Sequence, residues 1–139
     1  MQHESPQPGT LETGTGQLVM LVDDDSHVRE ASERILKRLG YRVAGFGCPL
    51  EALEAFRREP ASFALLITDL SMPEMSGDEL TRRVRAVRSD VPVVVCSGYR
   101  PEDAPDSVSF ERCSTITKPF TLLELRATVV AALKCELPA

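Results

Sequence analysis

The sequence predicts an α/β fold in which one parallel sheet is covered by helices on both faces. Short, nearly continuous apolar runs recur along the chain, as is typical of strands that are buried on both faces. Between these runs, apolar residues repeat every three or four positions, which is the pattern of an amphipathic helix. Strands that alternate with helices form parallel sheets with right-handed crossovers. We therefore expect five strand–helix units from residue 18 onward.

The first unit starts with the apolar run Leu18–Val22, which predicts a buried strand. Asp25 or Ser26 can cap the helix that follows, because a short polar side chain accepts hydrogen bonds from the first free N–H groups of a helix. Apolar residues at helical spacing indicate the inner face of this helix: Val28, Ala31, Ile35 and Leu39. Gly40 then stands where a helix typically ends.

The second unit combines a weaker strand, Val43–Phe46, with a helix that Pro49 can open at its first turn. Leu53 and Phe56 lie on the inner face of that helix. The third unit begins with Ala64–Thr68, another run typical of a buried strand.

A helix follows that is marked by Ser76 and Glu79, which have the spacing of a capping box. Its apolar positions are Leu80, Val84 and Val87. Val91–Cys96 predicts a fourth strand in which Cys96 is a small core residue. The fourth helix is poorly defined over residues 101–111, because two prolines interrupt any long helix there.

The last unit is a short β-prone run, Ser114–Thr117, followed by a final helix. Thr121 and Glu124 repeat the capping-box spacing at the start of this helix. Its apolar positions are Leu122, Leu125, Val129 and Leu133.

Length and composition fit one soluble domain. The chain has 139 residues, of which 42% are hydrophobic and 27% charged, and its net charge of −5 disfavours direct nucleic-acid binding. There is neither a secretory signal nor an apolar run near the ~18 residues that span a bilayer. We therefore expect a cytoplasmic protein without membrane contact. Residues 1–17 are poor in apolar residues, so we expect a flexible tail or linker before a core over residues 18–136.

Polar side chains follow four of the five predicted strands. Asp23–Asp25 come after the first strand, Asp69 after the third, Ser97 after the fourth and Lys118 after the fifth. Ligands of parallel sheets bind at the carboxyl ends of the strands, so these groups should meet at one edge. Each of them alone would more often be a turn, a cap or a surface residue, and their convergence is the informative signal.

This set of groups is suited to phosphoryl transfer onto a carboxylate. Clustered carboxylates repel one another unless a cation binds them, and Mg²⁺ prefers such hard oxygen ligands together with phosphate oxygens. A carboxylate beside Mg²⁺ can act as the nucleophile and form an aspartyl phosphate. Lys118 and Ser97 can supply the positive charge and the hydroxyl that a transferring phosphoryl group needs.

Four motifs in this order resemble the receiver domain of two-component response regulators, the CheY-like superfamily. They are LVMLVDDDSHVR (18–29), LLITDLSMPEMSGDEL (65–80), VPVVVCSGY (91–99) and TKPF (117–120). The resemblance runs from about residue 18 to residue 136. It implies a doubly wound, flavodoxin-like (βα)5 sandwich of three layers, whose five-stranded parallel sheet has the order 2-1-3-4-5.

The resemblance also assigns roles to the residues at the strand ends. It implies that Asp69 is the phospho-acceptor, that Ser97 hydrogen-bonds the phosphoryl group, and that Lys118 pairs with a phosphoryl oxygen. The implied Mg²⁺ ligands are Asp23, Asp24 as the closer ligand, Asp69 and the backbone carbonyl of Ser71. The Lys118–Pro119 bond is often cis in this family. Thr115 stands where many members carry an aromatic switch residue, which puts the usual coupling in doubt.

The implied partner is a sensor histidine kinase or a phosphotransfer domain, which would donate its phosphoryl group and so switch the interactions of the domain. The domain would phosphorylate and dephosphorylate itself without being a turnover enzyme. The sequence leaves open whether the protein forms a homodimer. It also leaves open whether the domain is a stand-alone regulator or a part of a hybrid histidine kinase. An alternative is a Mg²⁺-dependent aspartyl-phosphate phosphatase of the haloacid-dehalogenase type, since Asp23–Asp25 contains a DxD pattern. Such enzymes tend to need a longer chain.

Overall fold

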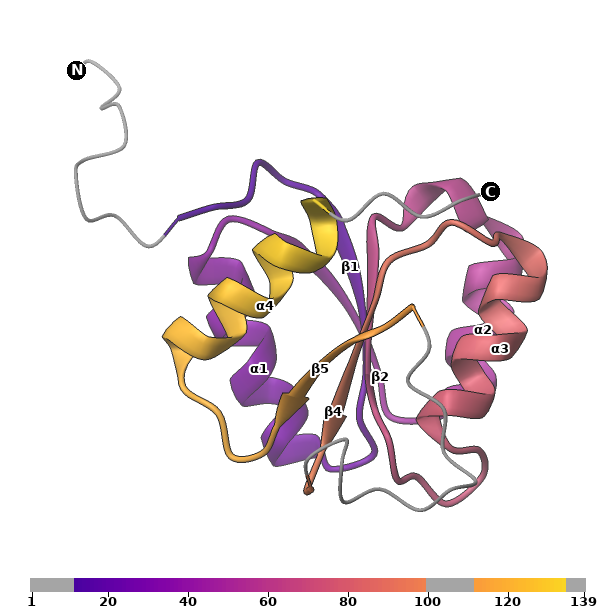
Figure 1. The fold of residues 1–139 in the computed structure, drawn as a ribbon. Helices are drawn as coiled ribbons and strands as arrows, with labels where there is room; N and C mark the ends of the chain where they lie inside the picture. The colour runs from indigo at the N-terminus through magenta and orange to yellow at the C-terminus, as the bar shows by residue number, and fades with distance from the viewer. Residues whose placement is uncertain (1–11, 100–111, 135–139) are drawn as a thin grey trace.

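The computed structural model describes residues 12–99 and 112–134, which form a five-stranded parallel sheet between two layers of helices (Figure 1). The sheet has the order β2-β1-β3-β4-β5, which confirms the predicted fold and topology. The strands are β1 (Leu18–Val22), β2 (Arg42–Phe46), β3 (Leu65–Asp69), β4 (Val93–Ser97) and β5 (Ser114–Thr117). β1 and β5 have the predicted bounds. The predicted starts of β2, β3 and β4 differ from these by one or two residues.

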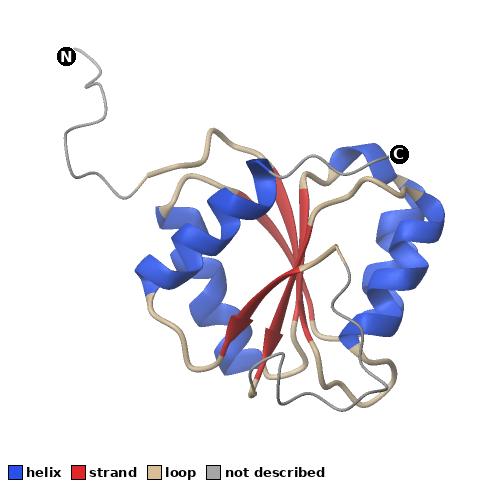
Figure 2. Cartoon of the chain, viewed as in Figure 1, coloured by secondary structure: helices blue, strands red, loops and turns tan. Residues whose placement is uncertain are grey.

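Helices cover both faces of the sheet, with α1 and α4 on one face and α2 and α3 on the other (Figures 1 and 2). Their bounds are α1 (Ser26–Arg38), α2 (Pro49–Arg58), α3 (Gly77–Val87) and α4 (Leu122–Lys134), and a 3-10 turn, η1, spans Pro60–Ser62. The helix α4 is the predicted fifth helix. The poorly defined fourth helix, at residues 101–111, lies outside the described residues.

The core has two halves because successive side chains of a strand point to opposite faces. In β1, Val19 and Leu21 pack under α1 and α4, whereas Met20 and Val22 pack with the buried residues of α2 and α3. All four are buried, as predicted for a central parallel strand.

Local signals placed the helix ends correctly. The carboxylate of Asp25 accepts hydrogen bonds from the N–H groups of His27 and Val28, so Asp25 is the cap of α1. Thr121 and Glu124 form both bonds of a capping box, at 2.8 and 3.1 Å. Gly40 has a φ of +99°, the left-handed conformation that glycine adopts at helix ends.

Two predicted inner faces are corrected. In α1 the buried residues are Ser32 and Leu36, whereas Ala31 is exposed and Val28 and Ile35 are half-buried. Leu39, which caps the end of the helix, is buried as predicted. The helix is therefore turned so that Ser32 and Leu36 face the sheet, while Ile35 packs at the edge of the core and Ala31 faces outward. In α3, Val87 is 40% exposed, since it is the last residue of the helix and lies beyond the core.

The described part of the predicted tail contacts the end of α1. The N–H groups of Thr13 and Gly14 donate to the carbonyl of Leu39, at 2.9 and 2.6 Å, and Gly16 N–H donates to Gly40 at 2.8 Å. The hydroxyl of Thr13 lies 3.0 Å from that of Tyr41. Among the described residues, no helix combines the length and the apolar character needed to cross a membrane.

Candidate functional site

Three carboxylates meet at the carboxyl edge of the sheet, where β1 and β3 end side by side. Val22 pairs with Thr68, so Asp23 and Asp69 are the next residues of two adjacent strands. One oxygen from each of Asp23, Asp24 and Asp69 lies within 4.8 Å of the others. Asp23 is buried, Asp69 half-buried and Asp24 exposed. The predicted acidic cluster is therefore brought together by the strand order itself.

Lys118 brings an amine to this cluster from the end of β5. Its Nζ lies 3.0 Å from Oδ1 of Asp69 and 3.3 Å from Oδ2 of Asp23. The backbone N–H of Lys118 donates to the carbonyl of Ser97 at 2.7 Å, which fixes the end of β5 against β4. The peptide bond between Lys118 and Pro119 is cis, as the resemblance implies.

The electrostatics of the cluster favour an additional cation. Burial raises the pKa of Asp69, the charges of Asp23 and Asp24 raise it further, and Lys118 only partly offsets this. Burial disfavours the charged form of Lys118, but its hydrogen bonds and charge interactions with Asp69 and Asp23 outweigh that and raise its pKa. One ammonium thus balances three carboxylates incompletely.

The donor set fits Mg²⁺. An octahedral Mg²⁺ site with bonds of ~2.1 Å places ligand oxygens roughly 3 to 4.2 Å apart, so three oxygens within 4.8 Å of one another can reach one ion when the carboxylates move closer together. The exposed side of Asp24 leaves room for the waters that Mg²⁺ usually retains. All ligand atoms in this cluster are carboxylate oxygens, a set that suits hard cations better than zinc.

Ser97 lies at the same edge, one residue beyond the pair Asp69–Cys96. Its hydroxyl is buried and is engaged by the backbone of Tyr99, to whose carbonyl it donates at 2.7 Å and from whose N–H it accepts at 3.0 Å. To donate to a phosphoryl oxygen, the Ser97 hydroxyl would have to give up its bond to the Tyr99 carbonyl, because it has a single proton. This contact to Tyr99 was not anticipated from the sequence.

The loop between β3 and α3 returns so that Gly77 contacts the backbone of Asp69 and Leu70. Gly77 N–H donates to the carbonyl of Leu70 at 2.7 Å, and a Cβ at Gly77 would overlap the carbonyl oxygen of Asp69. Glycine is needed here because the two backbone segments touch.

Ser71 is exposed in this loop, and the metal-binding role of its carbonyl stays a prediction. Thr115 is half-buried in β5 beside Val95.

Asp23 is held by contacts that sequence reasoning missed. Its N–H donates to Phe46 at 3.1 Å, its Oδ1 accepts from the N–H of Asp25 at 2.9 Å, and its carbonyl accepts from Nη1 of Arg29 at 2.7 Å. Arg29 ends the first quoted motif, but its contact with Asp23 has no signal in the sequence, because it depends on how α1 is rotated over the sheet.

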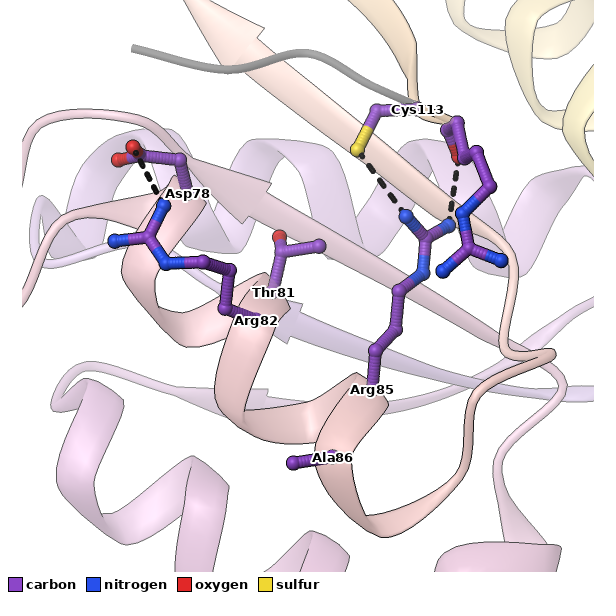
Figure 3. Close-up of a pocket in the computed structure, with 7 residues that line it drawn as sticks. Asp78, Thr81, Arg82, Arg85, Ala86 and Cys113 are labelled. Atoms are coloured by element: carbon purple, nitrogen blue, oxygen red, sulfur yellow. Dashed lines mark hydrogen bonds and ion pairs between the residues drawn. The ribbon is translucent and has the colours of Figure 1, made fainter. Parts of the chain in front are cut away.

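A hollow of about 380 Å³ lies beside α3, and none of Asp23, Asp24 and Asp69 lines it (Figure 3). In it, Arg82 pairs with Asp78 at 3.3 Å, and Arg85 donates to the carbonyl of Arg112 at 2.7 Å and contacts Sγ of Cys113. The contacts of Arg85 connect α3 to the segment before β5, whereas the Arg82–Asp78 pair lies within α3, so both arginines have a structural use.

Comparisons with known proteins agree on one family. Residues 19–130 match the family model of the response regulator receiver domain. The chain is 34% identical over 108 residues to the response regulator receiver protein CpdR of Brucella abortus, covering 77% of this chain and 88% of that protein. It is 34% identical over 116 residues to the sensor kinase CckA of the same organism, covering 80% of this chain but 12% of that protein.

A solved structure has the same fold. It is the receiver domain of the sensor histidine kinase PA1611 from Pseudomonas aeruginosa PAO1, crystallised with a magnesium ion coordinated in its active site cleft. The TM-score is 0.76 at 22% identity, covering 86% of this chain and 99% of that one.

Proposed function

Because the chain belongs to the response regulator receiver domain family of two-component systems, we propose that it accepts a phosphoryl group on Asp69. The observation that carries this proposal is the position of Asp69. Its carboxylate lies at the carboxyl edge of the sheet, 3.0 Å from Lys118 and beside two further carboxylates. The alternative of a haloacid-dehalogenase-type phosphatase is not supported by the comparisons.

In the proposed reaction, a carboxylate oxygen of Asp69 attacks the phosphorus of a phosphohistidine. An O–P bond forms, the N–P bond breaks, and the imidazole nitrogen that leaves keeps the electron pair and takes a proton from solvent. Lys118 would pair with a phosphoryl oxygen, since its ammonium already lies beside Asp69. Attack of water on phosphorus would later break the acyl O–P bond, release inorganic phosphate and restore the carboxylate.

We assign the metal to the acidic cluster. Asp23, Asp24, Asp69 and the carbonyl of Ser71 would hold Mg²⁺, with Asp24 as the closer ligand. When bound, Mg²⁺ would neutralise charge on the phosphoryl oxygens during transfer. The magnesium ion in the PA1611 receiver supports this assignment by analogy of fold.

The phosphodonor would be a sensor histidine kinase or a phosphotransfer domain, and we place it on the groove beside Lys118. This groove of about 400 Å³ lies between α1 and the segment after β5, and Val28, Ala31, Ile35 and Phe120 are among its lining residues. Lys118 lines the groove and also contacts Asp69, so a partner seated there can bring its histidine to the acceptor. The predicted apolar stripe of α1 forms much of this surface.

Phosphorylation would act as a switch, because it adds charge and acceptor oxygens beside Ser97 and Lys118. The chain would be a signalling domain that turns over only its own phosphoryl group. The relatives support both a stand-alone regulator and a part of a hybrid kinase, since the chain spans most of CpdR but only 12% of CckA. A cytoplasmic location and a homodimer stay predictions.

The test is phosphorylation by acetyl phosphate, followed by intact mass. With Mg²⁺ the wild type should gain one phosphoryl group, and Asp69→Asn should gain none. Asp90→Asn, at an exposed position in the loop after α3, is the matched control and should behave as the wild type. A wild type that gains no mass with Mg²⁺, or an Asp69→Asn variant that does, would refute the proposal.

A further inference from the structure

Arg29 holds the backbone of the residue whose carboxylate lies deepest in the acidic cluster. It lies on the first turn of α1, and its Nη1 donates to the carbonyl oxygen of Asp23 at 2.7 Å. The N–H of Asp23 is bound by β2 and its Oδ1 by the N–H of Asp25. The guanidinium therefore completes a set of contacts that fixes the orientation of Asp23.

Gly47 provides the space for this guanidinium. A Cβ at residue 47 would lie 2.8 Å from Nη1 of Arg29, closer than atoms pack, and 3.4 Å from its Cζ, an ordinary contact distance. Gly47 is exposed and has no left-handed φ, so its backbone does not require glycine. Its role is to leave room for the side chain that reaches over the end of β2.

We infer that Arg29 is a positioning residue of the Mg²⁺ site, and that it acts through its hydrogen bond to Asp23 in a space kept open by Gly47. The positive charge itself would repel a cation, so the hydrogen bond is the favourable contribution. Groups that orient metal ligands in this way affect metal affinity without touching the ion. The inference rests on the proposed function, because it assumes that Asp23 binds Mg²⁺.

The decisive variant is Gly47→Ala, because it displaces the guanidinium but keeps its charge. Mg²⁺ affinity is measured by isothermal titration calorimetry on the full chain. We expect binding about 10-fold weaker than in the wild type, the lower end of the range for outer-shell changes. In an Arg29→Ala background the same substitution should have no further effect, since its methyl group then has nothing to displace. Arg34→Ala, at an exposed position of α1, is the control and should bind as the wild type.

A second measurement does not need the metal. Without Mg²⁺, the NMR signals of the Asp23 carbonyl carbon and the Asp24 amide should shift in Gly47→Ala and in Arg29→Ala, and stay in place in Arg34→Ala. Wild-type Mg²⁺ affinity in Gly47→Ala, or an equal loss in both backgrounds, would overturn the inference. A wild type that does not bind Mg²⁺ at all would instead refute the metal assignment of the proposed function.

Discussion

Gly77 offers a sharp test of how the acceptor loop is built. It is the first residue of α3, and its N–H donates to the carbonyl of Leu70 at 2.7 Å. In Gly77→Ala the new Cβ would overlap the carbonyl oxygen of Asp69 and lie 3.0 Å from the Asp69 carbonyl carbon and the Leu70 Cα. These are backbone atoms, which cannot rotate away as a side chain does. The start of α3 must therefore move away from β3.

The loss of stability in Gly77→Ala follows from two costs and one offset. Overpacking costs about 1–3 kcal/mol, and weakening the bond to Leu70 costs about 0.5–1.5 kcal/mol. Alanine restricts the unfolded chain more than glycine does, which offsets about 0.4–1 kcal/mol. We expect the free energy of unfolding to fall by about 0.5–4 kcal/mol.

Urea denaturation followed by far-UV circular dichroism measures this change. Gly98→Ala is the matched control, because among the described residues no atom beyond its chain neighbours lies within 4 Å of a Cβ at this exposed position after β4. Its stability should stay within about 0.5 kcal/mol of the wild type. If Gly77→Ala were as stable as Gly98→Ala, the close approach of α3 to the acceptor loop would be wrong.

Three further variants or reagents test the site. Asp69→Asn should unfold at a higher temperature than the wild type at pH 7 without Mg²⁺. The pKa of Asp69 is raised in the folded protein, so its contribution to stability is fully present only below pH 3.8, the usual pKa of an aspartate. That contribution is lost as the pH rises through the folded pKa, and the neutral amide in Asp69→Asn avoids the cost of the buried charge. A lower unfolding temperature would contradict this. Ser97→Ala should lose about 0.5–1.5 kcal/mol of stability, because the Ser97 hydroxyl binds the Tyr99 backbone. Ser97→Thr keeps the hydroxyl and should lose less. Equal losses in the two variants would show that these hydrogen bonds do not stabilise the fold. Burial raises the pKa of Cys96 to about 12, so iodoacetamide at pH 8 should modify the half-buried Cys48 and spare Cys96, as peptide mass spectrometry can check. Equal modification of both would show that Cys96 is not buried.

Much of the fold could be predicted because its signals are local. Leu18–Val22 is apolar at every position, which is typical of a strand buried on both faces. The capping pair Thr121 and Glu124 lies within one turn of helix and needs no tertiary information. The meeting of Asp23 with Asp69 could be predicted as well, because the carboxyl ends of parallel strands share an edge.

What could not be predicted depends on how elements are rotated against one another. The stripe of α1 contains Ala31, which is exposed, while the polar Ser32 is buried, because the helix is turned relative to its most apolar side. That same rotation brings Arg29 to the Asp23 carbonyl. A sequence pattern gives the periodicity of a helix, but the packing against the sheet selects the face that is buried.

The central claim is that the phosphoryl group is carried by Asp69, and borohydride trapping tests it most directly. After reaction with acetyl phosphate and Mg²⁺, borohydride reduces an aspartyl phosphate to homoserine, which peptide mass spectrometry locates along the chain. We predict homoserine at residue 69 and unmodified aspartate at Asp23, Asp24 and Asp25. Homoserine at one of these three residues in place of residue 69, or none in a phosphorylated sample, would contradict the account.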